Sequence, residues 1–194
     1  MTSSPKAPGQ EYAERCYRSP AGIGGGVLLL ALAAWLGGDA IASGEGDTPW
    51  LALAGLLWAV PLIIAFTLRP AVWAGEERLL VRNPFRTITL PWASVEAVRA
   101  GYSSEVLAGG AKYQLWAIPV SLRQRKRAAR ASARGGEEPS RAPSDQAVQE
   151  LGELAERCAS REGARGEPAV RWAYELIVPS VVGLVLLVVL AAVG

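Results

Sequence analysis

Residues 78–92 read RLLVRNPFRTITLPW, and this stretch carries the clearest strand signals in the chain. Apolar residues alternate with polar ones in its second half, so Ile88, Leu90 and Trp92 fall on one face of an extended segment. The Asn83-Pro84 pair is typical of a tight turn, because proline disfavours helix in the residue before it. The stretch therefore predicts two antiparallel strands joined by a turn.

Further strands are predicted after this hairpin. Pro91 ends the second strand or places it at a sheet edge, because proline has no N–H to donate. Residues 95–100 can form a third strand, and the three glycines and two serines of residues 101–110 indicate a loop. Residues 113–122 read as a longer apolar strand, in which Pro119 again favours an edge position.

Two helices are predicted next. Residues 123–134 are rich in arginine and alanine, which favour helix, and Arg123, Arg127, Arg130 and Arg134 fall on one helical face. A flexible linker extends to residue 143, and a second helix runs from Asp145 to about residue 161. Its apolar stripe requires a hydrophobic surface, which the strands supply. The stripe comprises Ala147, Val148, Leu151, Leu154, Ala155 and Cys158.

Three long uncharged runs flank this region. Of all residues, 51% are hydrophobic although 20% are charged, so the apolar residues must be clustered. The uncharged runs cover residues 19–38, 48–68 and 176–194. A helix rises about 1.5 Å per residue, so about 20 residues cross a hydrocarbon core of about 30 Å. The sequence thus predicts an α-helical membrane protein with three transmembrane helices, the first two forming a hairpin at about 21–42 and 49–68.

The first run admits a second interpretation. Lys6, Arg15 and Arg18 could form the basic region of a secretory signal peptide, and residues 40–42 resemble a cleavage site. Asp39 precedes that site, and a second span follows almost at once, so we expect an uncleaved helix. Gly22 and Gly26 have the spacing that lets membrane helices approach closely, but tolerance of glycine at a helix start explains the same residues equally well.

The charges that flank the spans predict the orientation. The connection between the first two spans contains Asp39, Glu45 and Asp47 but no lysine or arginine. Basic residues lie before the first span, after the second and before the third. Because basic flanks stay on the cytoplasmic side, we expect the N-terminus and the 70–175 region in the cytoplasm and the C-terminus outside. We place the protein in the plasma membrane.

The expected organisation follows from these signals. It comprises a disordered tail (1–18), a transmembrane hairpin (19–69), a cytoplasmic α+β domain (70–162) containing the basic helix and linker (123–143), a tether (163–175) and the third span (176–194). The only cysteines, Cys16 and Cys158, are far apart in sequence and form no CxxC pair, so a zinc site or disulfide is not expected.

The cytoplasmic region resembles a known family. Residues 81–86 and 91–95, together with residues 115–120 and the basic run after them, are similar to the bacterial pleckstrin-homology-like (PH-like) domain. The likeness is to small actinobacterial membrane proteins of the low molecular weight protein antigen 6 type, and it covers about residues 72–161. It implies a bent antiparallel sheet closed at one end by a C-terminal amphipathic helix. We can assign four or five of the seven strands that such a sheet has.

The sequence contains no catalytic constellation. It has no histidine, no GxSxG or phosphate-binding loop, and no paired carboxylates at metal-ligand spacing, so neither an enzyme nor a cofactor or metal is expected. We interpret the chain as a non-enzymatic membrane-anchored scaffold or adaptor that binds a protein partner or anionic lipid headgroups. The alternative is an accessory subunit of a transport or cell-envelope enzyme complex.

The basic segment supplies the candidate binding residues. They are Arg123, Arg125, Lys126, Arg127, Arg130 and Arg134. Basic residues near a cytoplasmic membrane attract anionic lipid. A solvent-exposed helix without a ligand would carry the same charges if they only follow the positive-inside bias of membrane proteins. The segment lacks the interleaved aromatic residues that stack on bases, so we expect no nucleic acid as a partner, and no small-molecule substrate is evident.

Overall fold

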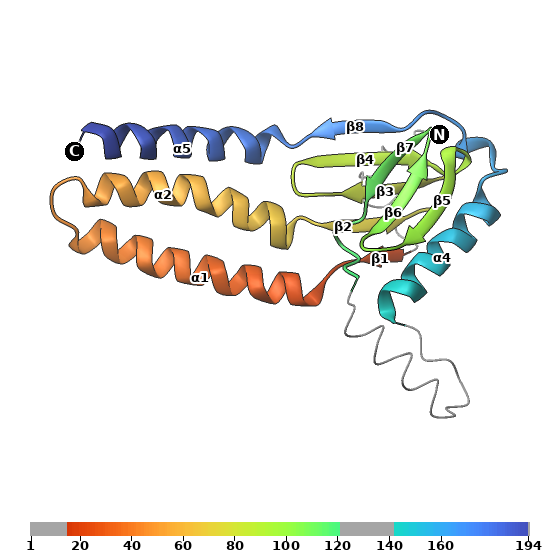
Figure 1. Ribbon diagram of the computed structural model, residues 1–194, viewed down its shortest axis with the longest axis horizontal. Helices are drawn as coiled ribbons and strands as arrows, with labels where there is room; N and C mark the ends of the chain where they lie inside the picture. Colours follow the sequence, from red (N-terminus) through yellow and green to blue (C-terminus); the bar gives the residue numbers. More distant parts are fainter. Residues whose placement is uncertain (1–14, 121–141, 194) are drawn as a thin grey trace, which may run out of the picture. The chain divides into compact units, whose positions relative to one another are not determined.

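The computed structural model describes residues 15–120 and 142–193 (Figure 1). The described chain forms two compact units. The first comprises residues 15–18, 71–82, 87–120 and 142–170, and the second comprises residues 19–70, 83–86 and 171–193. Each unit is described by itself below.

The first unit is built on two sheets, in which the pairs β1–β2, β2–β3, β3–β4, β5–β6 and β6–β7 are antiparallel. The five-stranded sheet has the order β1-β2-β3-β4-β8 and the three-stranded sheet the order β5-β6-β7. The strands of the larger sheet are β1 (Arg15–Tyr17), β2 (Ala71–Ala74), β3 (Arg78–Arg82), β4 (Arg86–Pro91) and β8 (Ala169–Trp172). Those of the smaller sheet are β5 (Val95–Ala100), β6 (Ser104–Ala108) and β7 (Ala111–Gln114).

The β3–β4 hairpin confirms the first sequence prediction. Leu79 pairs with Leu90 and Val81 pairs with Ile88, and all four side chains are fully buried. The residues between them in each strand are partly exposed, as the alternation requires. This pairing places one apolar face of the hairpin in the core of the unit.

Trp92 fixes the end of this hairpin. β4 ends at Pro91, as expected, and Trp92 begins a short 3₁₀ helix, η2 (Trp92–Ser94). The indole is fully buried, and its Nε1 donates a hydrogen bond of 2.9 Å to the carbonyl oxygen of Gly75. The Trp92 backbone N–H donates to the carbonyl of Glu77 at 3.1 Å. Both bonds tie η2 to the β2–β3 turn, so a polar ring nitrogen is buried without losing its partner.

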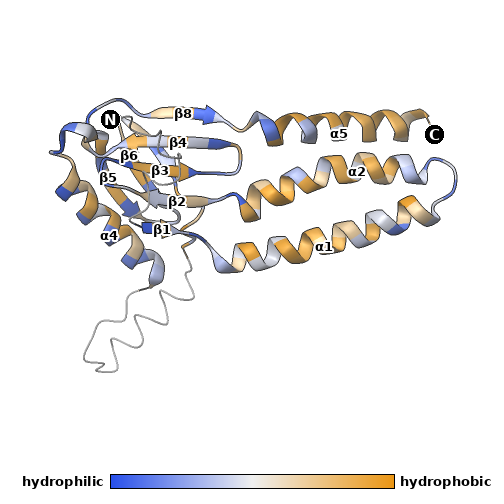
Figure 2. Cartoon of the chain, turned by 180° about the vertical axis from the view of Figure 1, so that it is seen from behind, coloured by the Kyte–Doolittle hydropathy of each residue, from blue (hydrophilic) through white to orange (hydrophobic). Residues whose placement is uncertain are grey.

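Helix α4 (Pro143–Cys158) packs against the sheets with the stripe that the sequence predicted. Figure 2 shows one hydrophobic and one hydrophilic side along this helix. Its buried apolar residues are Ala147, Val148, Leu151, Leu154, Ala155 and Cys158. Leu151 is fully buried, and most of the stripe belongs to the same core as the β3–β4 hairpin.

Two strand predictions were wrong. Residues 101–110 contain β6, in which buried and partly exposed residues alternate, because Ser104 occupies a buried position that an apolar residue would have made recognisable. Of the predicted strand over 113–122, the structure describes residues up to 120, and among these only Tyr113 and Gln114 belong to a strand, β7. Leu115 and Ile118 are buried after it in a turn, in which the Ile118 N–H donates to the Leu115 carbonyl at 3.2 Å. Their hydrophobicity reflects burial rather than strand structure.

The terminal segments of the first unit are also more ordered than expected. Residues 15–17 of the expected disordered tail form β1, and the expected tether contains β8 and part of a 3₁₀ turn, η3 (Glu162–Ala164). The Glu150 carboxylate on α4 accepts hydrogen bonds from Arg15 (2.7 Å) and from the Tyr17 hydroxyl (2.8 Å). Burial of the Tyr17 hydroxyl is the larger cause, and its hydrogen bond to Glu150 the second, that raises the pKa of Tyr17 to about 12. Backbone pairing with β2 and this polar cluster hold β1 in the sheet, although its sequence has no apolar alternation.

The second unit contains three long helices in which hydrophobic residues predominate (Figure 2). They are α1 (Pro20–Ser43), α2 (Thr48–Ile63), which continues as the π-helical η1 (Ile64–Leu68), and α5 (Tyr174–Val193). Each is long and apolar enough to cross a membrane. The predicted bounds of the first two spans agree closely, whereas α5 begins two residues earlier than expected and so includes Glu175.

Glycines allow these helices to pack closely. α2 contacts both α1 and α5. A Cβ atom on Gly26 would collide with the Thr67 side chain, and one on Gly183 would collide with the backbone of Trp58. The close-approach interpretation of the glycines in the first span therefore holds for Gly26, which leaves the space that the Thr67 side chain occupies.

Replacing Leu151 with glutamate tests the packing of α4. Leu151→Glu should lower the free energy of unfolding by about 3–5 kcal/mol, because it removes a buried leucine and places an unpaired carboxylate in the core. Chemical denaturation of the full chain in detergent, followed by circular dichroism, would measure this loss. Gln146→Glu, on the exposed face of the same helix, is the matched control. Equal effects of the two changes would contradict the observed packing.

Candidate functional site

The structure does not place the binding residues that the sequence proposed. Arg123, Arg125, Lys126, Arg127, Arg130 and Arg134 all lie outside the described residues. Within residues 15–120 and 142–193, no group of three histidine, cysteine or acidic residues could hold a metal ion. The candidate site must therefore be sought in the surfaces that the described elements form.

A groove lies between β5 and α4 in the first unit. It has a volume of about 440 Å³. One side is formed by consecutive residues of β5, and the other by residues that follow one another on a single face of α4 or directly after it. The lining comprises Val95, Glu96, Ala97, Val98, Gly152, Ala155, Glu156 and Ala159.

Strand β5 forms the edge of the three-stranded sheet. Within the described residues it pairs with β6 alone, and its other edge has no neighbouring strand. The register of the β5–β6 pair shifts between Val95 and Ala97, as at a β-bulge. Edge strands can present backbone N–H and C=O groups to an added strand. The groove therefore runs beside a strand edge that another extended segment could join.

The small residues on one face of α4 leave the groove open. The helix turns Leu151 and Leu154 toward the core, and this places Gly152 and Ala155 on the neighbouring face, beside β5. A Cβ atom added to Gly152 would meet no atom within 4 Å. Glycine in a helix interior costs about 0.5–1 kcal/mol relative to alanine. Packing within the described residues thus gives no reason for this glycine, whereas its lack of a side chain widens the groove.

The rim of the groove is acidic and its lining is otherwise apolar. Glu96 and Glu156 are both exposed and stand on opposite sides, one on the strand and one on the helix. One carboxylate oxygen of Glu96 accepts a hydrogen bond of 2.8 Å from the Gly110 N–H in the β6–β7 turn, which fixes its position. Val95, Val98 and Ala155 supply apolar surface between them. Such a surface suits a segment that carries apolar and basic side chains.

Comparison with known proteins identifies a related domain over part of the chain that includes the β5 side of the groove. Residues 69–154 match the family model for the bacterial PH domain. This match supports the PH-like domain that the sequence suggested, and it includes all of β5 and α4 as far as Leu154. PH domains are generally non-catalytic binding modules, and no enzyme family is indicated. Searches of the curated proteins and of the solved structures found no match.

The sequence contained part of the information needed to find the groove. It predicted the strand over 95–100 and the apolar stripe of α4, but not that these two elements lie side by side. The signal that could have indicated a site is Gly152, a helix-disfavouring residue inside an otherwise favourable helix. The acidic residues gave no such signal, because glutamate is common on exposed helix faces.

Replacing Gly152 with alanine tests whether the fold requires this glycine. Gly152→Ala should raise the free energy of unfolding by about 0.5–1 kcal/mol, because the added methyl group enters open space and the unfolded chain becomes less flexible. Denaturant titration of the full chain in detergent would detect the shift. A loss of stability would mean that neighbouring structure, and not a ligand, dictates glycine at this position.

Proposed function

We propose that this chain is a non-enzymatic, membrane-anchored scaffold or adaptor whose PH-like domain binds an extended segment of a partner protein in the β5–α4 groove. The observation that carries the proposal is the open space above Gly152, beside the edge strand β5. An extended peptide can add to a sheet edge through main-chain hydrogen bonds, while pockets beside the strand select its side chains.

The chemistry of the groove favours a particular kind of segment. β5 and α4 line opposite sides of the groove. A strand that pairs with β5 would therefore project alternate side chains toward Gly152 and Ala155 on α4. The exposed Glu96 and Glu156 favour basic residues at the rim, where complementary charge improves specificity more than affinity.

The membrane location completes the proposal. The three apolar helices are long enough to span a bilayer, and the basic flanks favour a cytoplasmic N-terminus and PH-like domain, with the C-terminus outside. The spans would then keep the groove at the cytoplasmic face of the membrane and raise its effective concentration for membrane-bound partners. We also propose that the chain is related to the small actinobacterial membrane proteins of the low molecular weight protein antigen 6 type.

Crosslinking in cells tests the groove. A photoreactive amino acid at Glu156 should crosslink the full-length chain to a partner, and the same group at Glu153, an exposed position on α4 outside the groove lining, should not. Gly152→Trp should remove the crosslink by filling the groove, whereas Gly152→Ala should preserve it. Mass spectrometry of the product identifies the partner. Equal crosslinking from Glu156 and Glu153, or none from either, would speak against the groove.

Thiol labelling tests the orientation. Cys16 is exposed and Cys158 is buried, so Cys16→Ser gives a background in which new cysteines can be probed. Tyr102→Cys, at a fully exposed side chain, should resist an impermeant thiol reagent on intact cells and react after permeabilisation. Glu45→Cys, in the connection between α1 and α2, should react on intact cells. Reaction of Tyr102→Cys on intact cells would reverse the proposed orientation.

Anionic lipid headgroups are a second candidate ligand, favoured by the spacing of the four arginines on one predicted helical face. Four charges at about 1 kcal/mol each provide at most about 4 kcal/mol, which corresponds to an affinity near millimolar. This suffices to orient a domain that spans already hold at the surface. The basic segment would therefore position the domain, while the groove would select the partner.

Vesicle binding tests this second role. A soluble fragment of residues 70–172, which keeps β8 at the edge of the larger sheet, should sediment with vesicles containing phosphatidylglycerol, but not with pure phosphatidylcholine vesicles, and binding should fall steeply with salt. Changing Arg123, Arg127, Arg130 and Arg134 to glutamine should abolish binding and leave the circular dichroism spectrum unchanged. If the unmodified domain ignores acidic vesicles at low salt, the segment has no lipid role.

A further inference from the structure

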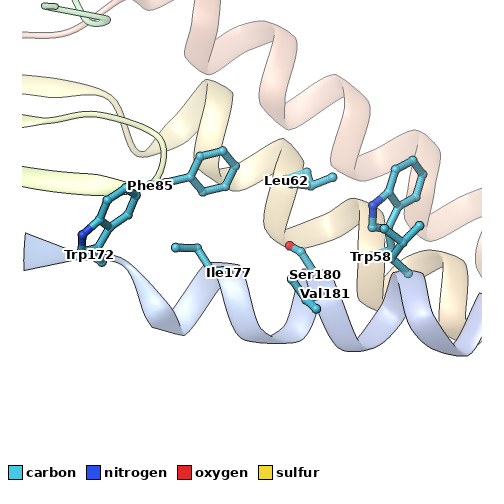
Figure 3. A pocket seen from close by; sticks show the side chains of 8 residues that line it. Trp58, Leu62, Phe85, Trp172, Ile177, Ser180 and Val181 are labelled. Atoms are coloured by element: carbon cyan, nitrogen blue, oxygen red, sulfur yellow. The ribbon is translucent and has the colours of Figure 1, made fainter.

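An apolar cavity lies between α2 and α5 in the second unit (Figure 3). Its volume is about 350 Å³, within the range of small-ligand pockets, which is about 300–1,000 Å³. It is lined by Trp58, Leu62, Phe85, Trp172, Ile177, Ser180, Val181 and Leu184. Ser180 carries the one hydroxyl among them, which donates to the Leu176 carbonyl at 2.8 Å within the same helix, and Trp58 and Trp172 each add an indole N–H.

The two ends of the cavity differ. Phe85 and Trp172 lie at one end, and Trp58 lies at the other (Figure 3). Near Trp58, the missing side chain of Gly183 brings the backbone of α5 against that of α2. The lining residues Ile177 and Leu184 are seven positions apart on α5, which corresponds to a length of about 10 Å. The cavity is thus an elongated slot that ends where the two helices meet.

The aromatic end is held in place by polar and aromatic contacts. The Phe85 ring meets the Phe66 ring edge-to-face at 5.3 Å, and the Phe85 carbonyl accepts a hydrogen bond of 2.8 Å from the Ala173 N–H. Arg69 forms a 2.9 Å ion pair with Glu175, close in sequence to Trp172. Charged groups therefore gather near this end, whereas the slot itself is apolar.

We propose that this cavity binds one hydrocarbon chain of a membrane lipid, with the lipid headgroup at the Phe85–Trp172 end. Water is a poor occupant, because an ordered water needs two to four polar partners. The lining offers only the Ser180 hydroxyl, which already donates within its own helix, and the indole N–H groups of Trp58 and Trp172, which lie at opposite ends (Figure 3). Tryptophan also favours the boundary between hydrocarbon and headgroups, which suits Trp172 beside the charged end.

The slot is continuous with the outer surface of the helices. Val181 and Leu184 line it and are also 54% and 46% exposed, so the cavity opens on the side that hydrocarbon would cover in a bilayer. In that setting a lipid chain can enter sideways without crossing a polar barrier. The site is independent of the β5–α4 groove, and it requires only that α2 and α5 span the membrane.

Photolabelling in bilayers tests the site. The full chain would be reconstituted with a phosphatidylcholine that carries a diazirine on one acyl chain, irradiated and mapped by mass spectrometry. We expect labelling of Leu62, Ile177 and Val181 to exceed that of Val178 and Val185, exposed α5 residues outside the cavity lining, at least threefold.

Filling the cavity provides the control. Ser180→Phe should reduce the excess labelling to the level of the outer face, whereas Val182→Phe, on the exposed side of α5, should leave it unchanged. Should Ser180→Phe fail to fold, Val181→Trp obstructs the opening from an exposed position. Uniform labelling around α5, weaker labelling of the cavity than of the outer face, or no labelling of either would overturn the proposal.

Discussion

Burial of one stripe of α4 is the interaction on which the first unit depends. Leu151 is fully buried, and Leu154 nearly so, in the core that the β3–β4 hairpin also enters. At about 1.5–3 kcal/mol for each large apolar side chain, this contact outweighs any single polar contact of the unit. Because a helix has a fixed period, burying the stripe also fixes which residues face β5. The groove is therefore a geometric consequence of core packing, and no loop has to be ordered to form it.

The elements with strong local patterns were predictable, and those that rely on partners were not. The β3–β4 alternation and the α4 stripe are visible in the sequence because burial on one face repeats with the period of the element. β1 and β8 have no such pattern, since they join the sheet through backbone hydrogen bonds, and Arg15 and Tyr17 hold β1 through Glu150. β6 was missed for a related reason, because a buried serine interrupts its apolar face.

The candidate sites show the same division. The strand and the helix that form the groove were each predicted. The groove itself forms only because these two elements, which are far apart in the sequence, lie side by side in the fold. The cavity between α2 and α5 was even less accessible to sequence reasoning, because nearly every residue of these helices is apolar and no contrast marks the ones that line it. In contrast, the basic segment was conspicuous in the sequence because charge stands out without any knowledge of the fold.

Three glycines in helices show how structure separates packing from binding. Gly26 and Gly183 are explained by the chain itself, because a side chain at either position would collide with the neighbouring helix segment. Gly152 has helical backbone geometry and open space around it, so neither backbone conformation nor packing among the described residues requires it. It nevertheless lowers helix stability. Its cost to α4 is therefore not offset by packing within the described residues. At this position the space it leaves opens beside the edge strand β5, where a partner's backbone could approach.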